Sequence, residues 1–161
     1  MQRRLVLGLA ALAVLGGAAL FYVSSVPDSR PFSPNPAFSE PLKPLSIENV
    51  IMEVAIADTA AERAMGLSGT QALPEGMGLL FVFESDGTPG FWMKDMLFPI
   101  DIVWISANGE VVGIEEQVSP DSFPTIFQPV EPVRYVLEVP GGFSAKNNLQ
   151  KSMKVSVEMA L

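Results

Sequence analysis

Residues 100–118 read IDIVWISANGEVVGIEEQV and carry the clearest signal for the fold. Two runs rich in β-branched residues, Ile100–Ser106 and Glu110–Val118, flank the dipeptide Asn108-Gly109. Asn-Gly between such runs predicts a β-hairpin, because a type I′ turn needs a positive φ at both of its central positions. The segment therefore predicts two neighbouring antiparallel strands.

Further strands and short helices are predicted on both sides of this hairpin. Thr59 and Glu62 have the spacing of a capping box and predict a helix from about Ala60 to near Gly66, and a second helix is expected around Phe143–Asn147. We thus predict a mainly β fold, a compact antiparallel sheet or small barrel with one or two short helices. The segments with the alternation or length of strands are Ile47–Ala57, Leu79–Phe83, Val133–Val139 and Met153–Met159.

The N-terminus carries a targeting segment. Arg3 and Arg4 precede an uncharged apolar run, Leu5–Val23, whose length as a helix suits a bilayer core about 30 Å thick. The run is either a cleaved secretory signal or an uncleaved membrane anchor, and a buried core helix is disfavoured because no polar face marks a solvent side. The arginines before the run predict that the remainder of the chain is exported to the periplasm or another extracytoplasmic space.

A proline-rich stretch separates this segment from the folded part. Of the 14 prolines in the chain, six lie between residues 27 and 45, which favours an extended spacer. We therefore divide the chain into a signal or anchor (1–26), a linker (27–45) and a β-rich globular domain (46–161). If residues 5–23 remain uncleaved, the chain is held at a membrane.

Composition excludes several classes of function. Ten basic and 18 acidic residues give a formal net charge of −8, which disfavours binding to a nucleic-acid backbone. The chain has no Cys and no His, which excludes disulfides, zinc fingers, Cys nucleophiles and Ser-His-Asp triads. We expect no metal site and no cofactor. Methionine thioethers can bind Cu(I), but methionines without a Cys or His beside them usually fill cores.

Residues 91–101 combine aromatic and charged side chains more densely than any other part of the chain. One interpretation is a hydrophobic loop that packs beneath the sheet, with Lys94 and Asp95 in solvent. The other is the wall of a ligand site, in which Trp92 stacks on a ligand and Lys94 and Asp95 make polar contacts.

Asp101 and Glu138 are the candidate carboxylates. Alternation places Asp101 on the strand face of Val103 and Ile105, where a carboxylate must find a partner or change its pKa. It either forms a buried ion pair with an Arg or Lys or acts as a tuned acid or base in a cleft. Glu138 shares a strand face with Val136. The two carboxylates could form a hydrolytic pair, which requires a separation of about 5–9.5 Å.

Six motifs follow one another along the second part of the chain. They are Glu62–Leu67, Leu73–Phe83, Phe91–Lys94, Pro99–Ile102, Gly109–Val112 and Arg134–Gly142. The order of these motifs resembles the bacterial and archaeal domain-of-unknown-function 192 family. The resemblance covers about Ile47 to Val157 and implies a compact, mostly antiparallel β domain that is often exported or membrane-anchored, with no established activity.

The resemblance also implies a set of site residues and two departures. Family members commonly have Met where this chain has Ser68 and Asn where it has Asp95. An ionised Asp95 cannot donate the hydrogen bond that an Asn could donate to a ligand. The positions of this chain that match the family pattern are Arg63, Gly66, Phe91, Met93, Lys94, Pro99, Asp101 and Glu138.

These observations favour a non-enzymatic, exported β domain that binds a small ligand or a partner in the cell envelope. One alternative is a carbohydrate-active hydrolase that uses Asp101 and Glu138. Another is a structural module of an envelope complex without a site. The predicted ligand-binding residues are Arg63, Trp92, Met93, Lys94, Asp95, Asp101 and Glu138.

Overall fold

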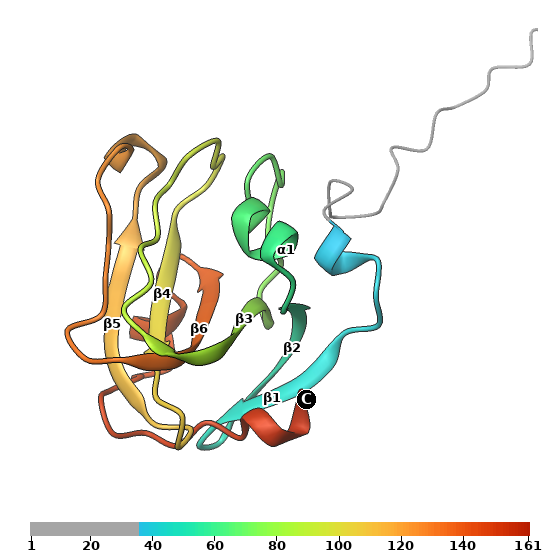
Figure 1. Ribbon diagram of the computed structural model, residues 1–161, viewed down its shortest axis with the longest axis vertical. Coiled ribbons are helices and arrows are strands. Elements are labelled where there is room, and N and C mark those ends of the chain that lie inside the picture. Colours follow the sequence, from blue (N-terminus) through green and yellow to red (C-terminus); the bar gives the residue numbers. More distant parts are fainter. Residues whose placement is uncertain (1–35) are drawn as a thin grey trace, which may run out of the picture.

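A computed structural model describes residues 36–161, which form a mainly β domain (Figure 1). The predicted signal or anchor and residues 27–35 of the predicted linker lie outside the described residues. Within residues 36–161, no helix is long and apolar enough to cross a membrane. The strands are β1 (Lys43–Ile47), β2 (Val50–Ala57), β3 (Met77–Gly87), β4 (Ile100–Ile105), β5 (Val111–Val118) and β6 (Val133–Pro140). The helices are α1 (Ala60–Met65) and α2 (Phe143–Lys146), with 3-10 turns at Pro36–Phe38, Pro120–Ser122 and Val157–Met159.

The six strands form one sheet in the order β1-β2-β3-β6-β4-β5. β2 and β3 pair in parallel, joined by the crossover that contains α1, and all other neighbours pair antiparallel. The sheet is therefore mixed but mostly antiparallel, which confirms the predicted fold class. β6 lies at its centre, between β3 and β4, and so carries Glu138 into the middle of the molecule.

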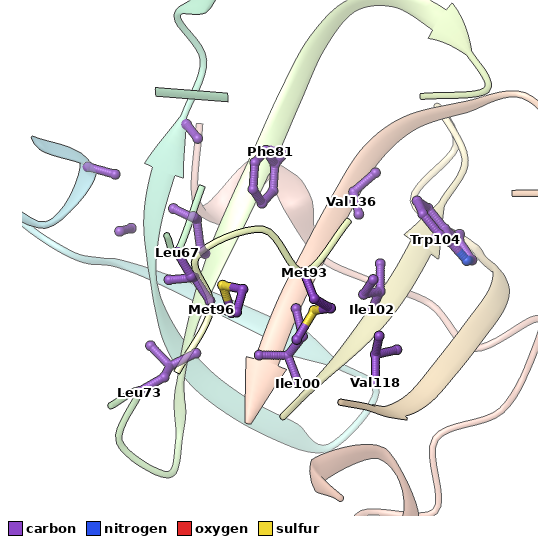
Figure 2. Packing of buried hydrophobic residues seen from close by; sticks show 14 of the residues in the cluster. Leu67, Leu73, Phe81, Met93, Met96, Ile100, Ile102, Trp104, Val118 and Val136 are labelled. Carbon is purple, nitrogen blue, oxygen red and sulfur yellow. The ribbon is translucent and has the colours of Figure 1, made fainter. Parts of the chain in front are cut away.

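The curved sheet buries apolar side chains on both faces. The loop-side core lies beneath α1 and the segments that follow β3, and it includes Phe81, Met93, Ile102 and Val136 (Figure 2). The C-terminal core lies on the opposite face and consists of buried residues that include Leu45, Leu80, Val103, Leu137, Val139, Phe143 and Val155. Strand alternation thus divides most of the buried sheet residues between the two cores.

The local predictions hold for both helices and fail at two strands. Helix α1 begins after Thr59, whose side chain accepts from the Glu62 backbone while the Glu62 side chain accepts from Thr59, as a capping box requires. The predicted strand Ile47–Ala57 is in fact two strands, because a turn with Glu48 at φ 50° separates Ile47 from Val50. β1 begins at Lys43, inside the segment predicted as linker.

The prediction of a C-terminal strand at Met153–Met159 is wrong. Val155 and Lys154 make isolated bridges to Ile47 and Glu110, and a 3-10 turn follows at Val157. The backbone of this segment bonds on one side to β1 and on the other to the β4–β5 hairpin, through Ser156 N to Ser46 O (2.9 Å) and Val155 N to Gly109 O (2.8 Å). It therefore crosses between the two edges of the sheet and ends beside β1 (Figure 1).

The β4–β5 hairpin forms as predicted, but its turn is not type I′. Gly109 N donates to Ser106 O (3.0 Å), so that Ala107 and Asn108 occupy the turn and Gly109 follows it. Gly109 has φ 65°, whereas Asn108 does not adopt a positive φ. This is the arrangement of a longer hairpin loop, in which a left-handed residue follows the turn and forms a bulge.

We expect Gly109→Ala to destabilise the fold by about 2–3 kcal/mol, because an L residue is strained at this φ and its Cβ meets the C-terminal segment. A Cβ at this position would lie 2.6 Å from Val155 O. Denaturant unfolding of the full chain measures the loss. Ala107→Gly in the same turn is the control, with an expected loss below about 1 kcal/mol. Equal effects of the two substitutions would contradict the close contact.

Candidate functional site

Glu138 has a buried carboxyl group, one oxygen of which has no hydrogen-bond partner among the described residues. On β6 it lies opposite Leu79 of β3 and Ile102 of β4, both fully buried residues of the loop-side core. Its side chain is 5% exposed, and among the described residues its Oε2 has no partner. Because such groups are nearly always satisfied in native proteins, this one requires an explanation.

Glu138 contributes to the lining of a pocket of about 130 Å³ on the loop side of the sheet. Three parts of the chain form the other walls: α1 with the turn after it, strand β3, and the segment between β3 and β4. Most of the lining residues are apolar. The lining residues are Arg63, Ala64, Met65, Gly66, Leu67, Ser68, Phe81, Phe83, Pro89, Gly90, Phe91, Trp92, Met96 and Glu138.

Burial raises the pKa of Glu138 from its ordinary value of 4.5 to about 8. The cause is desolvation, because the charged form loses its water and gains no compensating donor or cation from the described residues. At neutral pH the free carboxyl group is therefore mostly protonated. A neutral acid of this kind can donate or accept a hydrogen bond within the pocket.

Gly66 allows the turn after α1 to approach this carboxyl group. The residue has φ 52° and ψ −134°, a conformation that side chains with a Cβ rarely adopt. A Cβ placed there would lie 3.4 Å from the Phe81 ring and 4.0 Å from Glu138 Oε2. A side chain at this position would thus occupy space directly beside the carboxyl group.

Arg63 forms the end of the pocket near β3. Its Nη1 donates to Val82 O (2.9 Å) and to Asp58 O, and the guanidinium lies 5.3 Å from the centre of the Phe83 ring. These contacts join α1 to β3 and hold the cation at the wall. Arg63 was predicted only from the family resemblance, and the structure places it in the same pocket as Glu138.

Aromatic side chains surround the pocket. The rings of Phe81 and Phe91 meet edge to face with centroids 4.8 Å apart. Trp92 is 54% exposed and its ring lies 6.2 Å from Phe123 in a similar arrangement. Of the predicted residues, Trp92 therefore lines the pocket with Arg63 and Glu138. Met93 does not, since it is buried in the loop-side core (Figure 2).

Lys94 and Asp95 are exposed and lie outside the pocket lining. Their backbone carbonyls instead bind the turn after α1, with Ser68 Oγ donating to Lys94 O and Gly69 N donating to Asp95 O, both at 2.9 Å. Asp95 has φ 57°. Asn and Asp tolerate this left-handed conformation better than most residues. The backbone conformation therefore explains why either Asn or Asp suits this position.

Asp101 faces the opposite side of the sheet from Glu138. It pairs with Val139, a residue of the C-terminal core. Its carboxylate accepts three backbone N–H groups: Oδ1 from Gln117 (2.8 Å) and Gly142 (2.9 Å), and Oδ2 from Ser144 (2.7 Å). An ion pair was one predicted outcome, but within residues 36–161 the observed partners are backbone amides.

The two carboxylates are therefore not brought together. Asp101 fastens β5 and the start of α2 to β4, while Glu138 contributes to the pocket on the other face. This geometry gives no support to a hydrolytic pair, which needs both groups on either side of one bond. No cluster of three or more Asp, Glu, His or Cys that could hold a metal occurs among residues 36–161.

Much of the pocket wall could not be predicted from the residue patterns. Gly66 and Phe91 were noted only as family-pattern positions, and Ser68 as a departure from that pattern. Phe81 and Phe83 were predicted to lie on a strand. The strand pattern does not indicate that their side chains line a pocket. The only signal that could have found the wall was the resemblance across Leu73–Phe83.

Comparisons with known proteins agree with the fold. The chain resembles the crystal structure of a protein of unknown function from Novosphingobium aromaticivorans DSM 12444, with a TM-score of 0.68 and 25% identity over 71% of this chain and 84% of that one. It also resembles a proposed transcription regulator from Sinorhizobium meliloti 1021, with a TM-score of 0.68 and 24% identity over 72% and 93%.

A search of the curated proteins found no match. The profile of the DUF192 family, described as an uncharacterized ACR, matches residues 44–157, a span that contains all six strands except the first residue of β1, both helices and the whole pocket lining. Because this match covers well over half of the chain, the protein belongs to the DUF192 family.

Proposed function

We propose that the domain binds a small ligand in the pocket beside Glu138 and does not catalyse a reaction. The observation that carries this proposal is the buried Oε2 of Glu138, which has no partner among the described residues and lies in the lining of a pocket formed mostly by apolar residues. A buried polar group is costly unless something pairs with it. A bound ligand would supply that pairing.

The residues of the pocket favour binding over catalysis. Arg63 and Glu138 are the titratable groups among its described lining residues, and Arg63 is held by two backbone carbonyls and the Phe83 ring. Covalent or acid–base catalysis normally needs a nucleophile or a second acid–base group within hydrogen-bond reach. The chain contains no His or Cys that could take such a role.

We also propose that the domain acts outside the cytoplasm. This rests on the sequence of residues 1–26, in which Arg3 and Arg4 precede the apolar run Leu5–Val23. The net charge of −8 supports a partner other than nucleic acid. The intact mass of the native protein distinguishes a retained anchor from a cleaved signal.

Thermal unfolding of the full chain against a set of small fragments tests the binding function. We expect at least one fragment to raise the midpoint, because a ligand that binds only the native state stabilises it. Trp92→Ala should lower the affinity for that fragment about tenfold, since Trp92 forms an exposed part of the pocket wall. Ile51→Ala, at an exposed position on β2 outside the pocket lining, is the control.

Two results would contradict the proposed function. One is a fragment set in which no compound shifts the midpoint at any pH between 6 and 9. The other is a fragment whose affinity falls equally in Trp92→Ala and Ile51→Ala, which would place the binding site elsewhere. The first result would favour a structural module without a site.

A further inference from the structure

The carboxyl group of Glu138 lacks the partner that a buried anion needs. Leu79 and Ile102 flank it on the neighbouring strands, and Gly66 lies above its Oε2. Among the described residues, nothing donates a hydrogen bond to Oε2. A partner for the ionised form would bring N–H or O–H donors, and a positive charge would stabilise the carboxylate further.

The walls next to Glu138 also suit a cation. Phe81, Phe91 and Trp92 line the pocket, and the faces of aromatic rings attract cations through their quadrupole. The same walls favour a hydrocarbon chain or ring on the ligand, because they bury apolar surface. A small organic cation would satisfy both features. An anion would meet an acid and aromatic faces, and Arg63, the cation in the described lining, already donates through Nη1 to two backbone carbonyls.

The other charged groups near the pocket do not compensate Glu138. Arg63 is anchored to Val82 O, and no ion pair joins it to Glu138 within residues 36–161. On the remaining elements packed around the site, Lys94 and Asp95 are exposed outside the pocket and Asp101 faces the opposite side of the sheet. The exposed Glu62 caps α1.

The net negative charge of the domain adds a long-range attraction for cations. Residues 36–161 have a formal net charge of −10, because the residues before them contribute three arginines and one aspartate to the total of −8. A negative field of this kind raises the local concentration of cations and speeds their encounter with the site.

We propose that the pocket beside Glu138 binds a small organic ammonium ion, whose N–H groups pair with the carboxylate and whose hydrocarbon part lies against Phe81, Phe91 and Trp92. This inference rests on the proposed binding function and names the ligand class. The pocket volume of about 130 Å³ restricts the ligand to a small molecule. Binding draws on the ionised carboxylate, so it releases one proton wherever Glu138 is protonated in the free protein.

Isothermal titration calorimetry of the full chain with n-butylammonium and n-butanol tests this inference. The two probes share a carbon chain and differ in charge, and an alkylammonium with a pKa of about 10.4 stays charged throughout. Glu138 ionises with a pKa of about 8. We therefore expect the affinity for n-butylammonium to rise on the order of 50-fold between pH 6 and pH 8.5. The affinity for n-butanol should stay low and constant.

Glu138→Gln should abolish the preference for the ammonium and its pH dependence. Glu84→Gln, the same chemical change at an exposed position on β3 outside the pocket, should leave both intact. At pH 7 the binding enthalpy should vary with the ionisation enthalpy of the buffer, which reports the released proton.

The outcomes separate the ligand class from the proposed function. If n-butanol or another neutral fragment binds at pH 8.5 as tightly as n-butylammonium, the ligand class is wrong and the binding function stands. If Glu138→Gln keeps the full ammonium preference, the cation binds elsewhere and the inference fails. If neither these probes nor any fragment of the thermal screen binds, the inference and the proposed function both fail.

Discussion

Glu138→Gln is expected to stabilise the protein at alkaline pH. The glutamine keeps the shape of the side chain but never acquires a charge in its buried position between Leu79 and Ile102. From the pKa of about 8, we expect the variant to exceed the parent in unfolding free energy by about 3–5 kcal/mol above pH 8. Such a gain from removing a charge would mark Glu138 as a residue retained for function at the expense of stability.

The direction of the pH dependence follows from the raised pKa. Below pH 4.5 the carboxyl group is protonated in both the folded and the unfolded chain, so its ionisation costs the folded state nothing. Between pH 4.5 and about 8 the unfolded chain loses its proton while the folded protein retains it. The parent therefore loses stability by up to about 1.4 kcal/mol per pH unit relative to the variant, and above pH 8 the difference is constant.

Denaturant unfolding of both proteins at pH 4, 6, 7 and 9 measures this difference. Glu84→Gln, at an exposed position of β3, is the control and should show no comparable growth of the difference with pH. A Glu138→Gln variant that is as stable as the parent at pH 9, or less stable, would mean that the carboxylate has a compensating partner.

Asp101→Ala is expected to have an effect of similar size and opposite sign. The carboxylate accepts backbone N–H groups from Gln117, Gly142 and Ser144 at 2.7–2.9 Å. Each hydrogen bond to a charged acceptor contributes about 1.5–3 kcal/mol, and buried donors left without an acceptor add a desolvation penalty. Because the three bonds share one side chain, we expect a total loss of about 3–5 kcal/mol.

The exposed ion pair between Asp86 and Arg134 provides the control for Asp101. Their contact of 2.7 Å lies at the surface, so Asp86→Asn should cost at most about 1 kcal/mol. Asp101→Ala should also leave ligand binding intact at temperatures where it remains folded, because the carboxylate faces away from the pocket. A folded Asp101→Ala variant that loses binding would return this residue to the candidate site.

Much of the fold follows from local sequence patterns. The hairpin around Gly109 and the capped helix after Thr59 rest on interactions between residues close in the chain. The failures have non-local causes. Residues 153–159 alternate like a strand, yet their backbone bonds to two separate edges of the sheet, and no local pattern shows that arrangement.

The site could be predicted only in part for the same reason. Sequence alternation correctly placed Asp101 and Glu138 on strand faces, but it could not reveal that the two faces belong to different cores. Both residues appeared as carboxylates on apolar faces. The two residues differ in their tertiary surroundings. The turn at Gly142 and α2 supply hydrogen-bond donors to Asp101, whereas Oε2 of Glu138 receives none from the described residues.

The central claim is that Glu138 presents an uncompensated buried carboxyl group to the pocket. Its most direct test is a carbon-13 NMR titration of the Glu138 carboxyl carbon in the ligand-free full chain, with Glu138→Gln to assign the signal. We predict a midpoint near pH 8. A midpoint at or below 4.5, the ordinary value for a glutamate, would contradict it, because the carboxylate would then have a partner or free access to water.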